Sequence, residues 1–457
     1  MKKILSVCIF LLAWYTMFSK EYTVSLTLPG FNGQQAYVAQ INGDMSYFVD
    51  TVTADLSGTF RSVFTNQSPV GMYSFVLPQL RNAEVFFIFN KENVRMRTEI
   101  TQLQNVLIEE SEENRLYYAF IRHKQLVLGN AEILEYTFDH YTGSKYLEVT
   151  KQEYLQLLAS FSATISDMRA KSQGLFVDRI IGSSLPILPP TLVSEQEKKA
   201  YQIAHFFDGV DFSDTLLCNT NIFTTACITY LGLFSDQYQK SKNNTVFMQA
   251  VDVIVSKTKP YPTTHDFVVN YLLNGFETMG AQDVLQYISA KYLQDRQCVE
   301  GQSKTTLQRK ALNNTELAIG KTVPHFSFTS LQAKSFTQLD VAKGTHIIVF
   351  WASWCGHCTQ MLPAIVLDYA KKKDPGYSLI TVSLDSVLTD YKQFTSGIPE
   401  WNKTIQVCDT KQWEGQLAQA FYVYATPTIF IIQDGVIVSK PIEYDDYIAS
   451  MKKLGLL

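Results

Sequence analysis

The feature that most constrains this chain is an apolar run that ends in two closely spaced cysteines. The run reads THIIVFWASWCGHC, and Cys355 and Cys358 are separated by Gly356 and His357. A continuous apolar run of this kind predicts a strand that is covered on both faces of its sheet. The residues that follow predict a helix over 359–373, so Cys355 is expected at the N-terminus of a helix.

The cysteine pair has three chemical interpretations. A structural zinc site needs four ligands, and the chain's seven histidines are scattered without ligand spacing. A purely structural disulfide across two residues closes too small a loop to stabilise much. Disulfide exchange explains more, because a helix N-terminus favours the thiolate of Cys355, and Cys358 lies one helical turn further on, placed to resolve a mixed disulfide. His357, when protonated, adds positive charge near the sulfur; the alternative is that it is only a solvent-exposed helix residue.

The remaining sequence predicts a multidomain chain. Residues 20–108 alternate apolar and polar side chains, as in YTVSLTLPG, and are punctuated by glycines, which predicts an antiparallel β-sandwich. Residues 109–315 have helical periodicity, beginning with Ser111 as an N-cap, with a proline-rich loop at Gly182–Pro190. Residues 316–457 alternate strands and helices and end in a predicted hairpin that turns at Asp434-Gly435, which indicates an α/β fold.

The N-terminal residues 1–19 read as an export signal. Two lysines precede an apolar stretch too short to span a bilayer, and Ser19 is a small residue suited to cleavage, although an uncleaved anchor stays open. No other segment is apolar enough to cross a membrane, so no integral span is expected after cleavage. Export places the chain where disulfides persist. A net charge of −4 without a basic tract excludes nucleic acid as an expected partner.

Two motifs carry a resemblance to a known family. The segments FWASWCGHC and YATPTIFII resemble the thioredoxin superfamily, and the lead-in KTVPHFSFTSLQAKSFTQLD with HIIVFWASWC narrows this to TlpA-like thiol–disulfide oxidoreductases. The resemblance covers about residues 319–457 and implies a thioredoxin-like fold for the domain 316–457. More weakly, the β region followed by helices resembles N-terminal domains fused to such thioredoxins in envelope proteins of Bacteroidota.

The resemblance implies a role for each matching residue. Cys355 would be the attacking thiol and Cys358 the resolving thiol, with Trp354 flanking the exposed sulfur. Pro427 matches the family's cis-proline, and the backbone of Thr426 would pair with an extended substrate peptide, a form of strand addition. The expected partners are envelope proteins that carry thiols or disulfides and a membrane-bound thiol reductant. Neither a metal nor an organic cofactor is expected.

The chain departs from the family pattern at three places. Val349 stands where thioredoxins carry a buried aspartate, and Met361 stands where many TlpA-like reductases carry a glutamate. No base for Cys358 is therefore evident. The Gly356-His357 dipeptide resembles protein disulfide isomerase, whose potential of about −180 mV is more oxidising than the roughly −270 mV of thioredoxin.

The sequence therefore predicts an exported thiol–disulfide oxidoreductase, a reductase or an isomerase, in the periplasm or cell envelope. A thiol peroxidase is disfavoured because the Pro-x-x-x-Thr-x-x-Cys pattern of peroxiredoxins is absent. The alternative from another class is an envelope docking or scaffold protein that keeps the thioredoxin fold for binding. Among the other cysteines, one disulfide between Cys218, Cys227 and Cys298 and buried free thiols are both open, and Cys408 is expected to be a buried apolar residue.

Overall fold

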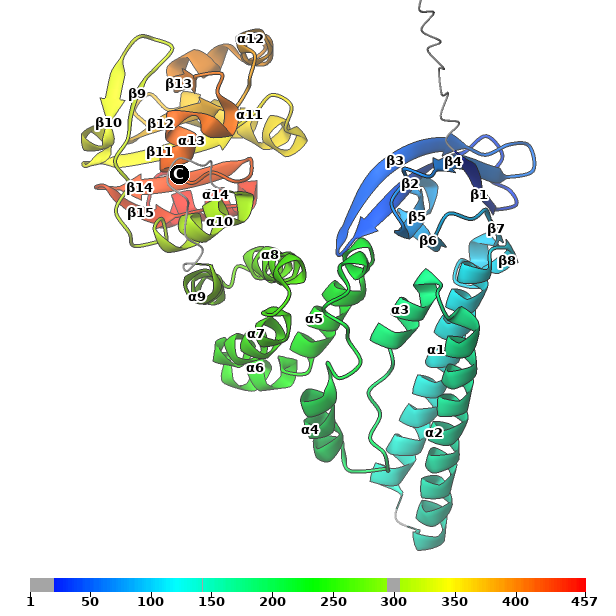
Figure 1. Ribbon diagram of the computed structural model, residues 1–457. Coiled ribbons are helices and arrows are strands. Elements are labelled where there is room, and N and C mark those ends of the chain that lie inside the picture. The colour runs from blue at the N-terminus through cyan, green and yellow to red at the C-terminus, as the bar shows by residue number, and fades with distance from the viewer. Residues whose placement is uncertain (1–19, 142, 294–304) are drawn as a thin grey trace, which may run out of the picture. The chain divides into compact units, whose positions relative to one another are not determined.

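The computed structural model describes residues 20–141, 143–293 and 305–457 (Figure 1). The chain forms two compact units, one of residues up to 242 together with 249–271, the other of 243–248 and 272–457. The predicted order of a β region, a helical region and an α/β region is confirmed. The predicted export signal at 1–19 lies outside the described residues. Within the described ranges, no helix has both the length and the hydropathy of a membrane span.

The N-terminal region is a sandwich of two sheets. Its strands are β1 (Glu21–Thr27), β2 (Gln35–Asn42), β3 (Met45–Thr53), β4 (Thr59–Thr65), β5 (Gly71–Leu77), β6 (Ala83–Phe89), β7 (Val94–Arg97) and β8 (Leu107–Glu110). The sheet orders are β4-β1-β7-β8 and β3-β2-β5-β6. Val24 and Leu26 of β1 pack in a core with Phe60, Phe75 and Phe87, all fully buried, as the alternation predicted. The predicted antiparallel sandwich is confirmed, except that β1 pairs with β7 in parallel.

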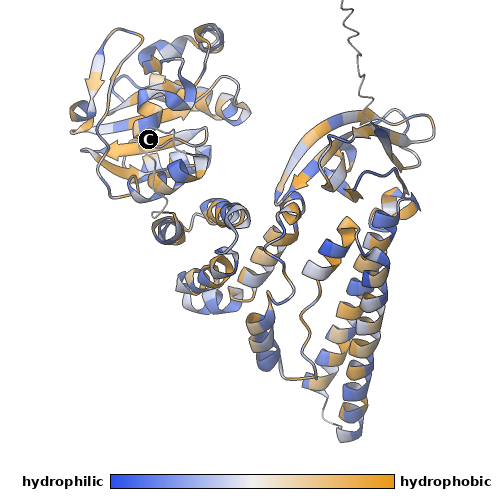
Figure 2. Ribbon diagram, viewed as in Figure 1, coloured by the Kyte–Doolittle hydropathy of each residue, from blue (hydrophilic) through white to orange (hydrophobic). Residues whose placement is uncertain are grey.

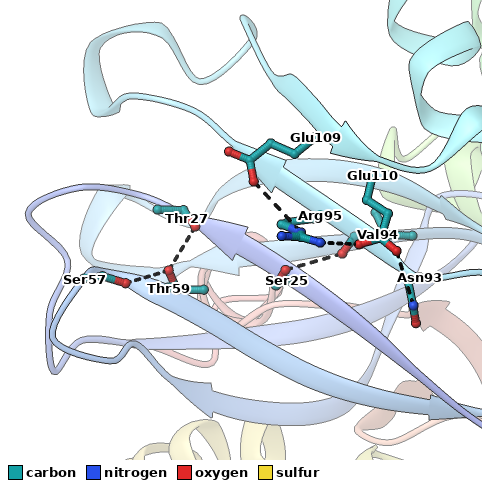
Figure 3. A network of polar contacts seen from close by, with 9 residues as sticks. All are labelled: Ser25, Thr27, Ser57, Thr59, Asn93, Val94, Arg95, Glu109 and Glu110. Atoms are coloured by element: carbon teal, nitrogen blue, oxygen red, sulfur yellow. Dashed lines mark hydrogen bonds and ion pairs between the residues drawn. The ribbon is translucent and has the colours of Figure 1, made fainter.

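The opposite face of the sheet β4-β1-β7-β8 is polar (Figure 3). The hydroxyls of Thr27 and Thr59 lie 2.9 Å apart, and Arg95 pairs with Glu110 at 2.6 Å and with Glu109 at 4.0 Å. Because these charged side chains are exposed, each ion pair contributes at most about 1 kcal/mol to stability. The strand alternation thus separates a dry inner face from a hydrated outer face.

The helices that follow are α1 (Glu112–His140), α2 (Ser144–Ser172), α3 (Phe176–Ser183), α4 (Glu195–His205), α5 (Ile222–Gly232), α6 (Ser235–Ser241), α7 (Thr245–Thr258) and α8 (Pro262–Thr278). Ser111 caps α1 as predicted, because its Oγ accepts from the backbone N–H of Asn114 at 3.0 Å. The buried carboxylate of Glu113 accepts from the first two N–H groups of α3, at 2.8 and 2.7 Å. The predicted loop at Gly182–Pro190 begins two residues late, because its first two residues complete the last turn of α3.

The second unit contains α9 (Gln282–Tyr292), α10 (Thr306–Thr315) and a five-stranded sheet. The further elements are β9 (Ser327–Thr329), β10 (Ser335–Thr337), β11 (Thr345–Trp351), α11 (Gly356–Ala370), β12 (Tyr377–Ser383), α12 (Leu388–Ser396), β13 (Ile405–Cys408), α13 (Gln416–Ala420), β14 (Thr428–Gln433), β15 (Val436–Ser439) and α14 (Tyr444–Lys453). The sheet order is β13-β12-β11-β14-β15. β11 pairs in parallel with β12 and antiparallel with β14.

The central strand β11 is buried on both faces, as its continuous apolar sequence predicted, and Figure 2 shows the strands of this sheet as mostly hydrophobic. The predicted hairpin is present as β14–β15, with Asp434 and Gly435 at φ 50° and 77°, the positive values that a tight two-residue turn requires. The helix expected at 359–373 lies at Gly356–Ala370 instead, because Cys355 itself caps it.

Candidate active site

Cys355 lies at the point where β11 has ended and α11 begins. It is the N-cap of α11, and its Sγ accepts from the backbone N–H of Cys358 at 3.2 Å. The two cysteines form a disulfide. Cys355 is 9% exposed and Cys358 is fully buried. When the bond is reduced, the helix dipole and the N–H of Cys358 stabilise negative charge on Cys355, the sulfur that a partner can reach.

A second segment meets the disulfide at the same edge of the sheet, where the neighbouring strand β14 begins. The Thr426–Pro427 peptide bond is cis and directly precedes β14. Because β14 runs antiparallel to β11, with Phe350 opposite Thr428, the start of β14 lies at the end of β11. The carbonyl oxygen of Thr426 is 3.4 Å from Cys355 Sγ. The fold thus brings the first cysteine and the backbone before Pro427 together across 71 residues of sequence.

Trp354 precedes the disulfide and is exposed. Its side chain is 56% accessible, and its ring centroid lies 6.4 Å from that of Trp413. A large amphipathic ring beside a reactive sulfur is a suitable contact for a protein partner, because it offers apolar area at a low entropic cost.

His357 has a partner that the sequence analysis missed. Its Nε2 lies 2.9 Å from Oε2 of Glu443, the N-cap residue of α14. The contact is an ion pair when the imidazole is protonated, and because both side chains are substantially exposed it contributes less than about 1 kcal/mol to stability. Its effect is to orient the imidazole beside the start of α11. No local pattern links two residues 86 positions apart, so only the fold reveals this pair.

Asp385 is a second residue that the sequence analysis missed. Its buried carboxylate accepts from the backbone N–H of Ser353 at 3.0 Å, from Ser353 Oγ at 2.7 Å and from Ser383 Oγ at 2.6 Å. These bonds fix the loop that leads to Cys355. A signal was available, because an aspartate directly after a buried parallel strand is expected at the carboxyl edge of the sheet, where sites form.

Two of the three places that depart from the family pattern hold buried apolar side chains. Val349 is fully buried in β11 and Met361 is buried on α11. Neither supplies a carboxylate to accept the proton of Cys358. Among the described residues, no group of three or more His, Cys, Asp or Glu side chains is arranged to hold a metal ion.

The remaining described cysteines are free. Cys218 and Cys227 are buried in the helical region, and burial raises their thiol pKa values to about 11 and about 12. Burial also raises the pKa of Cys408, which is half-buried. Thiols that stay protonated at neutral pH are poor nucleophiles. Cys298, the third candidate for a helical-region disulfide, lies outside the described residues.

Comparison with known proteins gives matches to the C-terminal region. Residues 319–440 match the model of the AhpC/TSA family. Thiol-disulfide oxidoreductase ResA of Bacillus thuringiensis is 26% identical over 126 residues, which cover 27% of this chain and 70% of the relative. The corresponding protein of Bacillus anthracis is 29% identical over 127 residues, again 27% of this chain and 70% of the relative.

The matching solved structures have low TM-scores against the whole chain. The thioredoxin domain of a thiol-disulfide oxidoreductase from Bacteroides vulgatus is 24% identical, covers 30% of this chain and 98% of its own, and has a TM-score of 0.27. A thioredoxin-like protein from Bacteroides caccae is 14% identical, covers 59% of this chain and 98% of its own, and has a TM-score of 0.37. The strand order and the family match together give the C-terminal region a thioredoxin-like fold, and in sequence this region is similar to the thiol-disulfide oxidoreductase ResA of Bacillus species.

Proposed function

We propose that this chain is an exported thiol–disulfide oxidoreductase that exchanges disulfides with proteins of the cell envelope through Cys355 and Cys358. The observation that carries the proposal is the position of Cys355. It caps α11, it is bonded to Cys358, and its Sγ lies beside the Thr426 carbonyl. A peptide that pairs with the backbone before Pro427 would therefore bring its own sulfur to Cys355.

The exchange balances without a cofactor. In the reduced protein the Cys355 thiolate attacks one sulfur of a client disulfide, a mixed disulfide forms, and the other client sulfur leaves as a thiolate that takes a proton. Cys358 then loses its proton and attacks Cys355 Sγ, which releases the second client thiol. The client has gained two electrons and two protons, and Cys355–Cys358 is again a disulfide. A dithiol reductant must supply the next pair of electrons, and we assign this role to a membrane-bound partner.

The direction of exchange depends on how strongly the site stabilises the thiolate. Positive charge on His357 stabilises reduced Cys355 and so makes the disulfide more oxidising. The carboxylate of Glu443 lies 2.9 Å from His357 and offsets part of the positive charge near Cys355. The export assignment rests on the pattern of residues 1–19, two lysines followed by a short apolar stretch.

The reduction potential of the Cys355–Cys358 pair tests the proposal. The purified protein is equilibrated against mixtures of reduced and oxidised glutathione, and Cys355→Ser is the control that identifies the pair. A potential near −270 mV indicates a reductant that needs an electron supply, and one near −180 mV indicates an isomerase or oxidase. A protein without a measurable couple would contradict the proposal and leave the docking-scaffold alternative. Fractionation of the host cell checks the location, since recovery only from the cytoplasm would contradict export.

A further inference from the structure

An apolar pocket lies between the helices of the first unit. It has a volume of about 480 Å³, which is within the range of small-molecule sites. Its walls come mainly from α1, the end of α3 with the loop after it, and α5, and most of its lining side chains are apolar. All of its lining residues belong to the first unit, whereas the redox cysteines belong to the second.

The wall from α1 carries one charge in an otherwise uncharged stripe. Tyr117, Ile121, Lys124 and Leu128 line the pocket and follow one another at intervals of four, three and four residues, so they share one face of the helix. A helix face with this spacing is expected to be apolar where it borders an apolar interior. Lys124 departs from that pattern, and among the described residues that line the pocket it alone is charged.

Lys124 has no anionic partner in the part of the chain that the structure describes. Its Nζ donates to the carbonyl of Ser184, the C-cap residue of α3, at 2.5 Å and lies 5.9 Å from the centre of the Phe120 ring. Burial lowers the pKa of Lys124, and no carboxylate opposes this shift. Ser184 also lines the pocket, so the ammonium lies at its wall.

A role in capping α3 does not exhaust this side chain. A cation at the end of a helix stabilises the last carbonyl groups, and the bond to Ser184 does so here. An ammonium has three N–H donors, however, and the Ser184 carbonyl takes one of them without neutralising the charge. A positive charge with spare donors therefore remains beside an apolar pocket.

These features together define the chemistry of a ligand. Apolar walls favour a hydrocarbon chain, because the burial of apolar surface drives binding. The unpaired ammonium favours one anionic group, since a charge-assisted hydrogen bond to a carboxylate is about twice as strong as a neutral one. A small polar anion would leave the apolar walls in contact with water, and an uncharged hydrocarbon would leave the ammonium without a counterion.

We propose that this pocket binds a single-chain aliphatic carboxylate of the fatty-acid class, with its chain between α1 and α5 and its carboxylate on Lys124 Nζ. The inference goes beyond disulfide exchange and gives the helical region a ligand of its own.

Isothermal titration calorimetry of the purified protein tests this assignment with two probes of equal chain length, each below its micelle concentration. Dodecanoate carries the anionic head group, and dodecyltrimethylammonium carries the opposite charge. The wild-type protein should bind dodecanoate at least about tenfold more tightly than the cation, the effect of one hydrogen bond between charged groups. Decanoate, which is two methylenes shorter, should bind about fifteenfold more weakly than dodecanoate.

Three variants locate the site. Lys124→Met keeps a long apolar side chain and removes the charge, so it should weaken dodecanoate binding about tenfold without weakening the cation. Ala226→Phe fills the pocket from α5 and should weaken both probes while Lys124 stays in place. Lys257→Met is the matched control, because this lysine of α7 is exposed and does not line the pocket, and it should bind both probes as the wild type does.

Far-UV circular dichroism checks that each variant is folded, since Lys124→Met also loses the bond to Ser184. Equal affinity of the wild type for the two head groups, or wild-type dodecanoate affinity in Lys124→Met, would overturn the assignment of a carboxylate to Lys124. Wild-type protein that does not bind dodecanoate, or unchanged binding in folded Ala226→Phe, would overturn the pocket as the site. If Lys124→Met does not fold, the head-group preference of the wild type and the Ala226→Phe variant decide the question.

Discussion

Glu277 of α8 and Lys310 of α10 form an ion pair that is largely shielded from solvent. Glu277 also contacts Tyr424, which lies three residues before the cis-proline Pro427. Lys310 Nζ lies 2.6 Å from Glu277 Oε2, and the two side chains are 4% and 27% exposed. Lys310 also donates to Asn274, and Glu277 accepts from the Tyr424 hydroxyl. At this distance and an effective dielectric constant of about 20, the gross Coulomb attraction is about 6 kcal/mol. Desolvation of both charges offsets much of that gain.

We therefore predict that Glu277→Gln lowers the free energy of unfolding of the second unit by about 3–5 kcal/mol, because it leaves the buried ammonium of Lys310 without its anion. Glutamine can still accept from the Tyr424 hydroxyl, but its amide nitrogen then faces the Lys310 ammonium, so the pair loses both its charge attraction and one hydrogen bond. The double variant Glu277→Gln/Lys310→Met removes both charges, and it should recover most of the loss. Recovery in the double variant would show that each charge depends strongly on the other, while the pair as a whole adds little to the free energy of unfolding.

Urea unfolding followed by tryptophan fluorescence measures these differences. The tryptophans of the described residues all lie in the second unit, at positions 351, 354, 401 and 413, so their emission reports on that unit. The control is Lys371→Gln, which breaks a pair with Asp368 in which the lysine is 72% exposed and which should cost less than about 1 kcal/mol. If Glu277→Gln costs no more than this control, the buried-pair argument is wrong.

Three further predictions follow from single sites. Asp385→Ala should lower stability by about 2–4 kcal/mol, because the buried donors of Ser353 and Ser383 lose their acceptor; the same urea assay checks it, and a cost below about 1 kcal/mol would contradict it. In reduced protein at pH 8, iodoacetamide should label Cys355 well before Cys227, whose pKa of about 12 leaves almost no thiolate; mass spectrometry of the labelled peptides reads out the order. Burial lowers the Lys440 pKa from 10.5 to about 8, so between these values the unfolded chain binds more protons and this group makes stability rise with pH. Urea unfolding from pH 7 to pH 9.5 should show a rise of about 2 kcal/mol from this group that Lys440→Met lacks, and equal slopes for both proteins would refute it.

The predictable parts of the structure are those that depend on interactions between residues close together in the sequence. The turn at Asp434-Gly435 and the cap at Ser111 are encoded by a few neighbouring residues, because backbone conformation and capping depend on short-range sterics and hydrogen bonds. The α/β character of the C-terminal region follows from its continuous apolar runs and the helices between them. Even the three-residue error at the start of α11 is local, since the cysteine was not recognised as the cap.

The parts that were not predictable depend on contacts between distant segments. The pairing of His357 with Glu443 and the burial of the Glu277–Lys310 ion pair leave no periodic trace in the sequence, because a buried and an exposed polar residue on a helix can have the same local pattern. Sequence patterns therefore do not show which polar residues are paired or buried by tertiary packing.

The geometry gathers the redox chemistry at one edge of the sheet. The chemistry is contiguous: β11, Cys355 and the start of α11 occupy one short stretch, and the antiparallel register of β14 with β11 forces Thr426 to the same edge of the sheet. The helices α8 and α10 precede the predicted thioredoxin-like domain, and Glu277 of α8 accepts a hydrogen bond from Tyr424, three residues before Pro427. On the proposed function, electron flow is set at the N-terminus of α11, where charge acts on sulfur.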